Sequence, residues 1–175
     1  MKVKNTLRIP IGFAAGVIFI IRANPTFRSF CVGTVIMLFG EAIRFISAGT
    51  LIKFEGVTCK GIYAYSRNPL YLGSFFIGLG ACITGRDILF STFFIIAYPI
   101  LYLRIIKREE HYLTGRYGDD YDRYKEKVSR FWSDGFNVGE ILRESTPFLA
   151  VKNRELRTVI GVVIVLTVMA LKMMF

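Results

Sequence analysis

Long apolar runs separated by short polar stretches dominate the chain. Crossing the hydrocarbon core of a bilayer takes about 20 helical residues. The first run is shorter than that, but flanking Lys and Arg side chains can reach the interface and a thinner bilayer can compensate. Five such runs leave too little polar sequence to cover them in a soluble fold, so the pattern predicts about five transmembrane helices. The runs extend over 9–21, 29–47, 68–85, 88–103 and 158–175.

This pattern predicts an all-α fold, a multi-pass helical membrane bundle with a helical catalytic region at its cytoplasmic face. The chain has 175 residues, of which 53% are hydrophobic. Such a composition excludes a disordered tail, and the length allows one domain. We therefore expect a single integral-membrane domain over 1–175. Three cysteines without a CxxC motif exclude a disulfide scaffold and a zinc ribbon.

The formal net charge of +10 fits the loops of a membrane bundle. The basic residues stand between the apolar runs and gather on no face of a soluble domain, so we predict no nucleic-acid partner. Placing the N-terminus in the cytoplasm puts most Lys and Arg on that side, as the positive-inside rule requires. Five spans then leave the C-terminus outside. No small-x-small cleavage pattern follows the first apolar run, so we expect an uncleaved first span rather than a secretory signal.

Two polar segments, 49–67 and 104–157, fall on the cytoplasmic side in this orientation. Chemistry is expected where these segments meet the membrane surface. In the second segment, Gly118 is expected to end a helix that leaves the membrane, and Asp119 to cap the next helix. For the tail over 133–152 two alternatives stay open: it covers the site as a lid, or it lies on the surface.

Charged and metal-binding side chains are few inside the apolar runs. Glu41 and Arg44 stand three positions apart on one face of the second span. Intramembrane charges face a cavity or a partner, or they neutralise each other near a helix end, and both alternatives stay open. The single histidine, His111, has no triad context and argues against a histidine-rich metal site. The sequence therefore predicts no metal.

Small residues recur at every fourth position in two of the spans. Such stripes let helix backbones approach closely, so we expect tight helix packing at both. A passage for a cofactor between the helices is the less common alternative. The stripes are Gly12 and Gly16 in the first span, and Ser74, Gly78 and Cys82 in the third.

The two polar segments carry two motifs whose order and spacing fit together. The first motif, over 61–73, reads Gly61-Ile-Tyr63 and then Arg67-Asn68-Pro69-Leu-Tyr71-Leu72-Gly73. The second, within 104–132, reads Glu109-Glu110-His-Tyr-Leu113 and then Tyr117-Gly118, Tyr121, Tyr124, Lys127 and Val128. With a transmembrane hairpin between them, the two motifs resemble the isoprenylcysteine carboxyl methyltransferase and phospholipid methyltransferase families over roughly residues 44–132. Each half alone is a weak signal, but the pair is specific.

This resemblance implies a helical membrane enzyme that transfers a methyl group from S-adenosyl-L-methionine to a lipidic, membrane-embedded acceptor. In keeping with it, the chain has no Gly-rich strand-to-helix fingerprint of a soluble nucleotide-binding fold. Lys127 occupies the basic position that the resemblance assigns to the acceptor side, and Arg130 stands nearby. The candidate catalytic residues are Glu110, Lys127 and Arg130. The implied cofactor-binding residues are Tyr63, Arg67, Asn68, Pro69, Tyr71, Leu72, Glu109 and Glu110.

Asn68 departs from the families' pattern, which usually has His at this position. Asn can donate a hydrogen bond but does not titrate near neutral pH. A carboxylate acceptor needs no base, whereas an amine acceptor must lose a proton, which Glu109, Glu110 or a tyrosine would have to accept. The departure therefore favours carboxyl O-methylation, with phospholipid amine N-methylation as the alternative.

Two hypotheses from other classes stay open. A sterol-type, NADPH-dependent membrane reductase shares some of this architecture but should show more spans. A non-catalytic lipid-binding membrane subunit should have lost the Glu pair or the Arg-x-Pro-x-Tyr motif, and both are intact. The expected partners are a lipidic or prenylated acceptor and membrane lipids, while the oligomeric state is not indicated. With no organelle address visible, we expect a prokaryotic cell membrane and an active site that faces the cytoplasm.

Overall fold

A computed structural model describes residues 8–52 and 56–174, with the backbone alone for 8–14. The described residues form helices and no strand, so the all-α prediction is confirmed. The helices are α1 (Arg8–Arg22), α2 (Phe27–Thr50), the 3-10 helix η1 (Gly61–Ala64), α3 (Pro69–Gly85), α4 (Ile88–Tyr117), α5 (Asp119–Lys127), α6 (Val138–Arg143), α7 (Pro147–Lys152) and α8 (Leu156–Met174).

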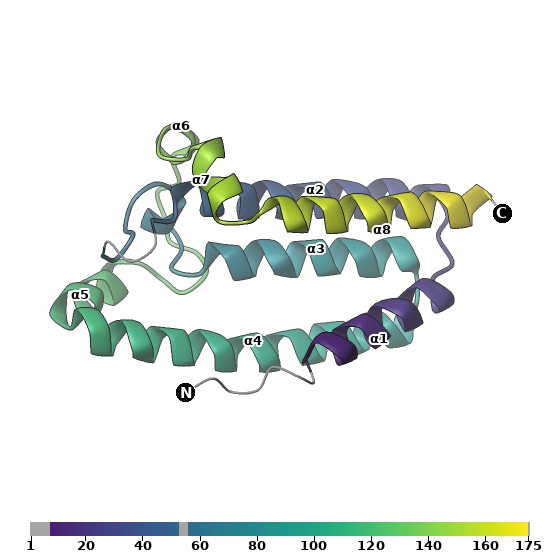
Figure 1. Cartoon of the computed structure of the whole chain (residues 1–175), viewed down its shortest axis with the longest axis horizontal. Helices are drawn as coiled ribbons and strands as arrows, with labels where there is room; N and C mark the ends of the chain where they lie inside the picture. The colour runs from purple at the N-terminus through teal and green to yellow at the C-terminus, as the bar shows by residue number, and fades with distance from the viewer. Residues whose placement is uncertain (1–7, 53–55, 175) are drawn as a thin grey trace.

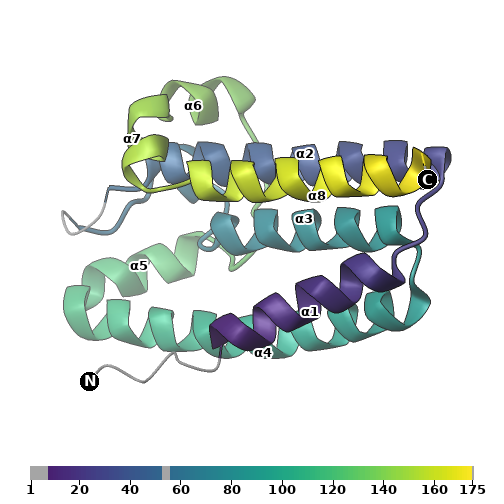
Figure 2. The ribbon, with the colours of Figure 1, turned by 45° about the vertical axis from the view of Figure 1, so that its right-hand side comes forward.

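Each of the five predicted apolar runs forms a helix, namely α1, α2, α3, α4 and α8. Three of these, α2, α4 and α8, are long and apolar enough to cross a membrane, and α3 is a shorter apolar helix. The protein is therefore a membrane protein built as a helical bundle. In Figures 1 and 2, α2, α3 and α8 run side by side along the long axis, with α4 and α1 on the other side of α3. The short helices α5, α6 and α7 lie at one end, and the connections from α1 to α2 and from α3 to α4 lie at the other.

The helix boundaries follow from the local sequence. Thr26 and Ser29 form a capping box at the start of α2, and Asp87 caps α4 by accepting a hydrogen bond from the backbone N–H of Phe90. Gly118, at φ 53°, separates α4 from α5, so the predicted break is confirmed. The expected cap is corrected, because Gly118 precedes the first turn of α5 and Asp119 lies within that turn. Its carboxylate there still favours the positive helix end.

Glycines set the contact between α2 and α3. A Cβ atom built on Gly40 would lie 2.6 Å from the carbonyl oxygen of Gly73, and one on Gly80 would lie 2.5 Å from that of Gly33. Real Cβ atoms do not approach so closely, so only glycine allows these backbones to meet. The sequence analysis missed this pairing, because the glycines recur every seven residues on each helix rather than every four.

The predicted small-residue stripes have different outcomes. In α3, a Cβ on Gly78 would run into the ring of Phe94 on α4, so this stripe does pack tightly. In α1, no atom of another part of the described chain lies within 4 Å of a Cβ built on Gly16, so among the described residues the expected tight packing at this position is wrong. Gly12, the other glycine of that stripe, lies outside the residues whose side chains are described.

Arg44 holds α2, α3 and α8 together near the polar end of the bundle. Its Nε and Nη2 donate to the carboxylate of Glu155 at 2.6 and 3.1 Å, and its Nη1 donates to the carbonyl of Leu70 at 3.3 Å. The alternative of a mutually neutralising Glu41–Arg44 pair is therefore wrong. Glu41 is buried, and its oxygens accept no hydrogen bond among the described residues. Arg44 instead faces Glu155 in the turn before α8 and Thr158 within α8, so it meets a partner, which is the other alternative for intramembrane charges.

Candidate active site

A cavity of about 340 Å³ opens at the polar end of the bundle. Three segments line it, namely the turn after α2, the stretch from η1 into α3, and the end of α4 with α5. The two motifs singled out in the sequence therefore meet around one space, although a helical hairpin separates them in the chain. The described lining residues are Leu51, Ile52, Gly56, Val57, Thr58, Tyr63, Arg67, Asn68, Pro69, Leu70, Tyr71, Glu109, Glu110, Tyr112, Leu113, Arg116, Tyr117, Tyr121 and Tyr124.

The turn before α3 is held by the segment that follows α5. Pro69 occupies the first turn of α3 and Asn68 precedes it, as the sequence predicts. Asn68 does not cap the helix with its side chain; its Nδ2 donates to the carbonyl of Arg130 at 3.3 Å. The backbone N–H of Arg67 donates to the carbonyl of Ser129 at 3.1 Å. These two hydrogen bonds bring both motifs into direct contact behind the cavity.

Glu110 is the buried anchor of this contact, with 9% of the residue exposed. Arg130 donates to its two oxygens from Nε at 3.1 Å and Nη2 at 2.6 Å, a bidentate arrangement that strengthens a charge-assisted pair. Arg67 lies 3.4 Å from the same carboxylate. The hydrogen bond to Glu110 raises the pKa of Arg130 above its ordinary value. Glu110 therefore positions two guanidinium groups, and its negative charge is neutralised by these two arginines.

Arg67 presents an unused donor at this site. Its side chain is 11% exposed, and its buried Nε–H has no hydrogen-bond partner among the described residues. A buried donor without a partner costs free energy unless a ligand or water satisfies it. Because Arg67 lines the cavity, this N–H is a place for an acceptor atom of a ligand.

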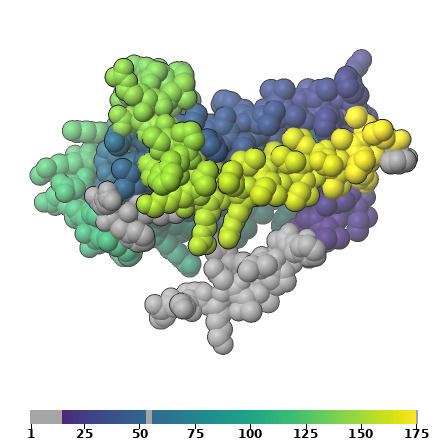
Figure 3. Space-filling view, turned by 45° about the horizontal axis from the view of Figure 1, so that its top comes forward, coloured from purple at the N-terminus to yellow at the C-terminus, as the bar shows by residue number. Residues whose placement is uncertain are grey.

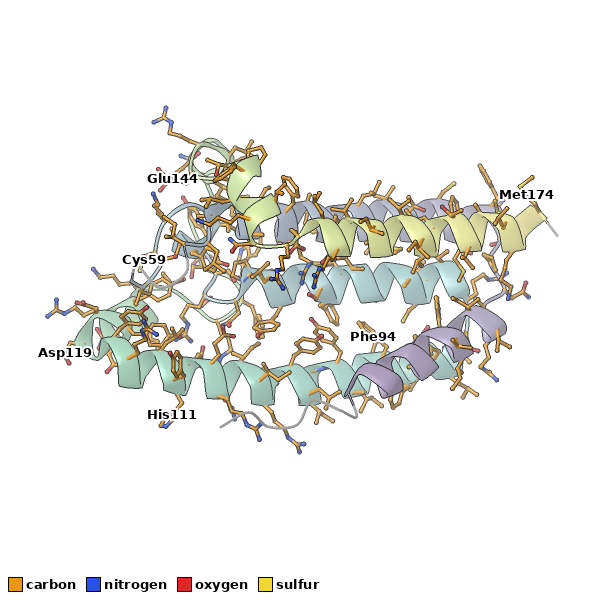
Figure 4. All side chains as sticks on the ribbon, viewed as in Figure 1. Cys59, Phe94, His111, Asp119, Glu144 and Met174 are labelled. Carbon is orange, nitrogen blue, oxygen red and sulfur yellow. The ribbon has the colours of Figure 1, made fainter. Side chains whose placement is uncertain are left out.

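Glu109 lies on the more open side of the cavity. The hydroxyl of Tyr71 donates to its carboxylate at 2.8 Å, and the Tyr71 ring meets that of Tyr102 edge-on at 5.4 Å. The ring of Tyr102 stacks on that of Tyr98 at 3.9 Å. Aromatic rings, with Phe94 labelled in Figure 4, continue this contact between α3 and α4 away from the cavity. The cavity therefore adjoins an aromatic seam that runs along the membrane-spanning part.

Three tyrosines form the inner wall. The hydroxyl of Tyr124 donates to the backbone carbonyl of Tyr63 at 2.6 Å. Burial raises the pKa of Tyr121 to about 12 and raises the pKa values of Tyr63 and Tyr124 further. These phenols are neutral at physiological pH, so they serve as ring surfaces and hydrogen-bond donors rather than as bases.

The structure brings most of the predicted site residues together. Of the eight predicted for the cofactor, all except Leu72 line the cavity, and Leu70 lines it instead because it lies on the facing side of the α3 turn. Arg130 stands behind Glu110 and does not line the cavity. Lys127 is exposed at the end of α5 and does not line the cavity either. His111 points away from the bundle (Figure 4).

Sequence reasoning missed two parts of the lining. The lining residues that follow α2, at 51–52 and 56–58, carry no motif, so nothing in the sequence marked them. Tyr112 and Arg116 lie on the same face of α4 as Glu109, at intervals of three and four residues. The Arg116 guanidinium donates to the Tyr112 hydroxyl at 2.8 Å. Following that helical spacing beyond the motif would have found both residues.

Comparisons with known proteins cover the same region. A profile of the family described as Ergosterol biosynthesis ERG4/ERG24 family matches residues 26–133, which include every described residue of the cavity lining. The chain is 30% identical over 132 residues to a protein of Schizosaccharomyces pombe named protein-S-isoprenylcysteine O-methyltransferase. That similarity covers 73% of this chain and 56% of the relative, so the chain spans little more than half the length of that protein. No solved structure matches the chain with significance.

Proposed function

Because the chain belongs to the ergosterol biosynthesis ERG4/ERG24 family and is isoprenylcysteine methyltransferase-like, we propose that it is a membrane methyltransferase that uses S-adenosyl-L-methionine. The observation that carries the proposal is the meeting of both motifs, 61–73 and 104–132, around one cavity. These motifs would form the catalytic region of a single membrane domain over 1–175. The acceptor would be a lipidic or prenylated molecule, and its carboxylate would take the methyl group.

The lining residues fit the proposed cofactor in charge and shape. Bound there, S-adenosyl-L-methionine supplies an electrophilic methyl group on a sulfonium centre, together with an ammonium, a carboxylate and an aromatic base. Glu109 offers an anion to the cationic groups, and the Arg67 Nε–H offers a donor to an oxygen. The rings of Tyr63, Tyr121 and Tyr124 supply π-faces for a cation or a base.

The residues of the cavity favour a carboxylate acceptor over an amine. An amine needs a base, but the Glu110 carboxylate is held by two arginines and the Glu109 carboxylate already accepts the Tyr71 hydroxyl. The tyrosines are neutral phenols with raised pKa values and are poor proton acceptors. A carboxylate oxygen forms its bond to the methyl carbon as the carbon–sulfur bond breaks, the electron pair stays on sulfur, and no proton moves. The protein then mainly aligns the reactants, which supplies several kcal/mol. The aromatic seam between α3 and α4 supports entry of the acceptor's lipid chain from the membrane.

A sterol-type reductase that uses NADPH is the second candidate, because the matched family is described by ergosterol biosynthesis. NADPH is a polyanion and needs several cations for its phosphates. The described lining has two arginines and two glutamates, and Arg67 is paired with Glu110. This balance suits the net positive methyl donor better than a polyanion.

Calorimetry on the purified full chain in detergent separates the candidates. We expect S-adenosyl-L-methionine and S-adenosylhomocysteine to bind, and NADPH not to bind.

Methyl transfer is then assayed with a prenylated cysteine that has a free carboxylate, its methyl ester as matched control, and phosphatidylethanolamine as the amine. Transfer to phosphatidylethanolamine alone would support amine N-methylation. Binding of NADPH alone would support the reductase, and binding of neither would support a non-catalytic lipid-binding subunit.

Asn68→His is expected to keep S-adenosyl-L-methionine binding and methyl transfer within a factor of about three of the wild type. A ring N–H of His can replace the Asn68 Nδ2 donor to the Arg130 carbonyl, a contact worth about 1 kcal/mol. Asn68→Leu, which has no hydrogen-bond donor on its side chain, should lose more of its methyl-transfer rate than Asn68→His. The measurement is the transfer rate of both variants from pH 6 to 8. A rate in Asn68→His that rises through the His pKa and exceeds the wild type would show that the reaction does use a base.

Cys59 reports which side of the membrane carries the site. We propose that the polar end faces the cytoplasm, as the basic residues there indicate. Cys59 is exposed at that end and Cys82 is buried, but Cys31 near the start of α2 is also exposed, so the experiment uses a Cys31→Ser background. We expect a membrane-impermeant maleimide to label Cys59 in inside-out vesicles and not in right-side-out ones. Partial burial and the nearby Asp120 raise the pKa of Cys59, so the labelling rate should still increase as the pH rises above 8. Labelling in right-side-out vesicles would reverse the topology.

A further inference from the structure

The segment after α5 forms two short helices that the family match does not cover, since the match ends at residue 133. We call residues 137–157, which hold α6 and α7, the elbow. No described lining residue of the cavity comes from it, so it is not a lid over that site. Figure 3 shows it protruding beside the start of α8. Its position is at the polar end of the bundle, where the spans leave the membrane.

Hydrogen bonds to the end of α2 fix the orientation of the elbow. The side-chain amide of Asn153 donates to the carbonyls of Ala48 and Leu51 at 2.8 and 2.9 Å. The backbone N–H of Thr146 donates to the carbonyl of Gly49 at 2.9 Å. These bonds satisfy carbonyls that the last turn of a helix leaves without partners. The elbow is therefore docked in one position, and its outer face is defined.

That outer face is apolar and joins the lipid-facing side of α8. On α7, Phe148 is 75% and Val151 is 48% exposed, whereas Ala150 is fully buried against the bundle. The exposed apolar positions continue along α8 at helical spacing. They are Leu156, Ile160, Val163, Ile164, Leu171 and Met174. Since α8 spans the membrane, its lipid-contacting surface extends without a break onto the elbow.

The acidic residues of the elbow have partners elsewhere in the chain, whereas its basic residues do not have such partners among the described residues. Its three acidic residues all have partners elsewhere in the chain, because Glu140 accepts from Tyr65, Glu144 pairs with Lys60 and the buried Glu155 pairs with Arg44. Its four basic residues are exposed and make no side-chain hydrogen bond or ion pair among the described residues. They are Arg143, Lys152, Arg154 and Arg157. The outward charge is therefore positive, next to exposed apolar side chains.

We propose that the elbow lies in the headgroup layer of the membrane and binds anionic lipids. Phe148 and Val151 enter the boundary between headgroups and acyl chains, as the apolar face of an interfacial helix does. Lys152, Arg154 and Arg157 contact the lipid phosphates beside them. A cation near an anionic lipid surface contributes favourably to the free energy of membrane binding, and this attraction falls off within a Debye length. The elbow thus ties the cytoplasmic end of α2 to the lipid surface.

Tryptophan fluorescence tests the position, because Trp132 is the single tryptophan of the chain. In a Trp132→Phe background, Phe148→Trp reports on the elbow, and Glu126→Trp, on the exposed polar face of α5, is the matched control. The full chain is reconstituted in phosphatidylcholine vesicles brominated near the headgroup. We expect bromine to quench Phe148→Trp strongly and acrylamide to quench it weakly, with the reverse for the control. Strong acrylamide quenching of Phe148→Trp without bromine quenching overturns the proposal.

Lipid selectivity tests the charges. Spin-labelled phosphatidylglycerol and phosphatidylcholine are compared for binding to the reconstituted chain. We expect a preference for phosphatidylglycerol of about fivefold or more, the factor that one cation near the surface supplies. Replacing Lys152, Arg154 and Arg157 with Gln should remove most of it, whereas Arg123→Gln on α5 should not. If the triple variant does not fold, high salt on the wild type should weaken the preference. A preference that neither change reduces overturns the proposal.

Discussion

Replacing Glu110 with alanine is expected to abolish measurable binding of S-adenosyl-L-methionine, with a loss of affinity of about 100-fold or more. The change removes the carboxylate that holds Arg130 at 2.6 Å and Arg67 at 3.4 Å. Breaking a buried ion pair costs about 3–5 kcal/mol, and the low end applies because the Arg130 side chain is 34% exposed. That cost falls on the stability of the site; the ligand in turn loses its hydrogen bonds to the displaced Arg67, at about 1.5–3 kcal/mol each, and each factor of ten in affinity is about 1.4 kcal/mol.

Three further variants make this result interpretable. Glu110→Gln keeps the side-chain volume but removes the charge, so it should lose affinity while the chain still folds. Glu109→Gln keeps an oxygen that can accept from the Tyr71 hydroxyl but removes the anion proposed to face the cationic groups of the cofactor, a loss of about tenfold or less. Glu126→Gln, exposed on α5, is the control for a carboxylate outside the cavity. Calorimetry is combined with size-exclusion profiles to verify folding. Normal affinity in Glu110→Ala would remove this residue from the site.

The lining of the candidate site was largely predictable because most of its residues belong to two short, spaced motifs. Pro69 marked the start of α3, and the pair Glu109-Glu110 marked the helical segment beyond the membrane. The spacing alone did not indicate that Glu110 would point inward to Arg130 while Glu109 faces the open side. That division depends on how the end of α5 folds back, which requires the contact between the Arg67 and Ser129 backbones. The exposed position of Lys127 has the same origin, since α5 turns it away from the cavity.

The fold was predictable at the level of spans and less so at their contacts. Apolar runs identify helices because the hydrocarbon core imposes both length and polarity. The partner of Arg44 was not predictable, because Glu155 stands 111 positions later in the chain. The glycine contact between α2 and α3 was also missed, since no local rule pairs Gly40 with Gly73 across two helices.

Replacing Gly40 with valine is expected to separate α2 from α3 and to lower the stability of the bundle by about 2–3 kcal/mol or more. A Cβ at this position would lie 2.6 Å from the Gly73 carbonyl oxygen and 2.7 Å from the Ile77 backbone nitrogen. Both are backbone atoms, so no side-chain rotation relieves the contact. The measurement is the thermal unfolding midpoint in detergent, which should fall. Gly161→Val on α8 is the matched control, because no described atom lies within 4 Å of a Cβ built there.

The same contact links helix packing to the site. Gly73 lies one turn into α3, and Pro69 at the start of that helix lines the cavity. Moving α3 away at Gly40 should therefore also weaken S-adenosyl-L-methionine binding. A Cβ built on Gly33 would likewise lie 2.5 Å from the Gly80 carbonyl oxygen, but further along α3 from the cavity. Gly33→Val should lower the unfolding midpoint and leave the affinity of the folded fraction near the wild type. Equal affinity losses in both variants would contradict this coupling and indicate a general loss of folded protein.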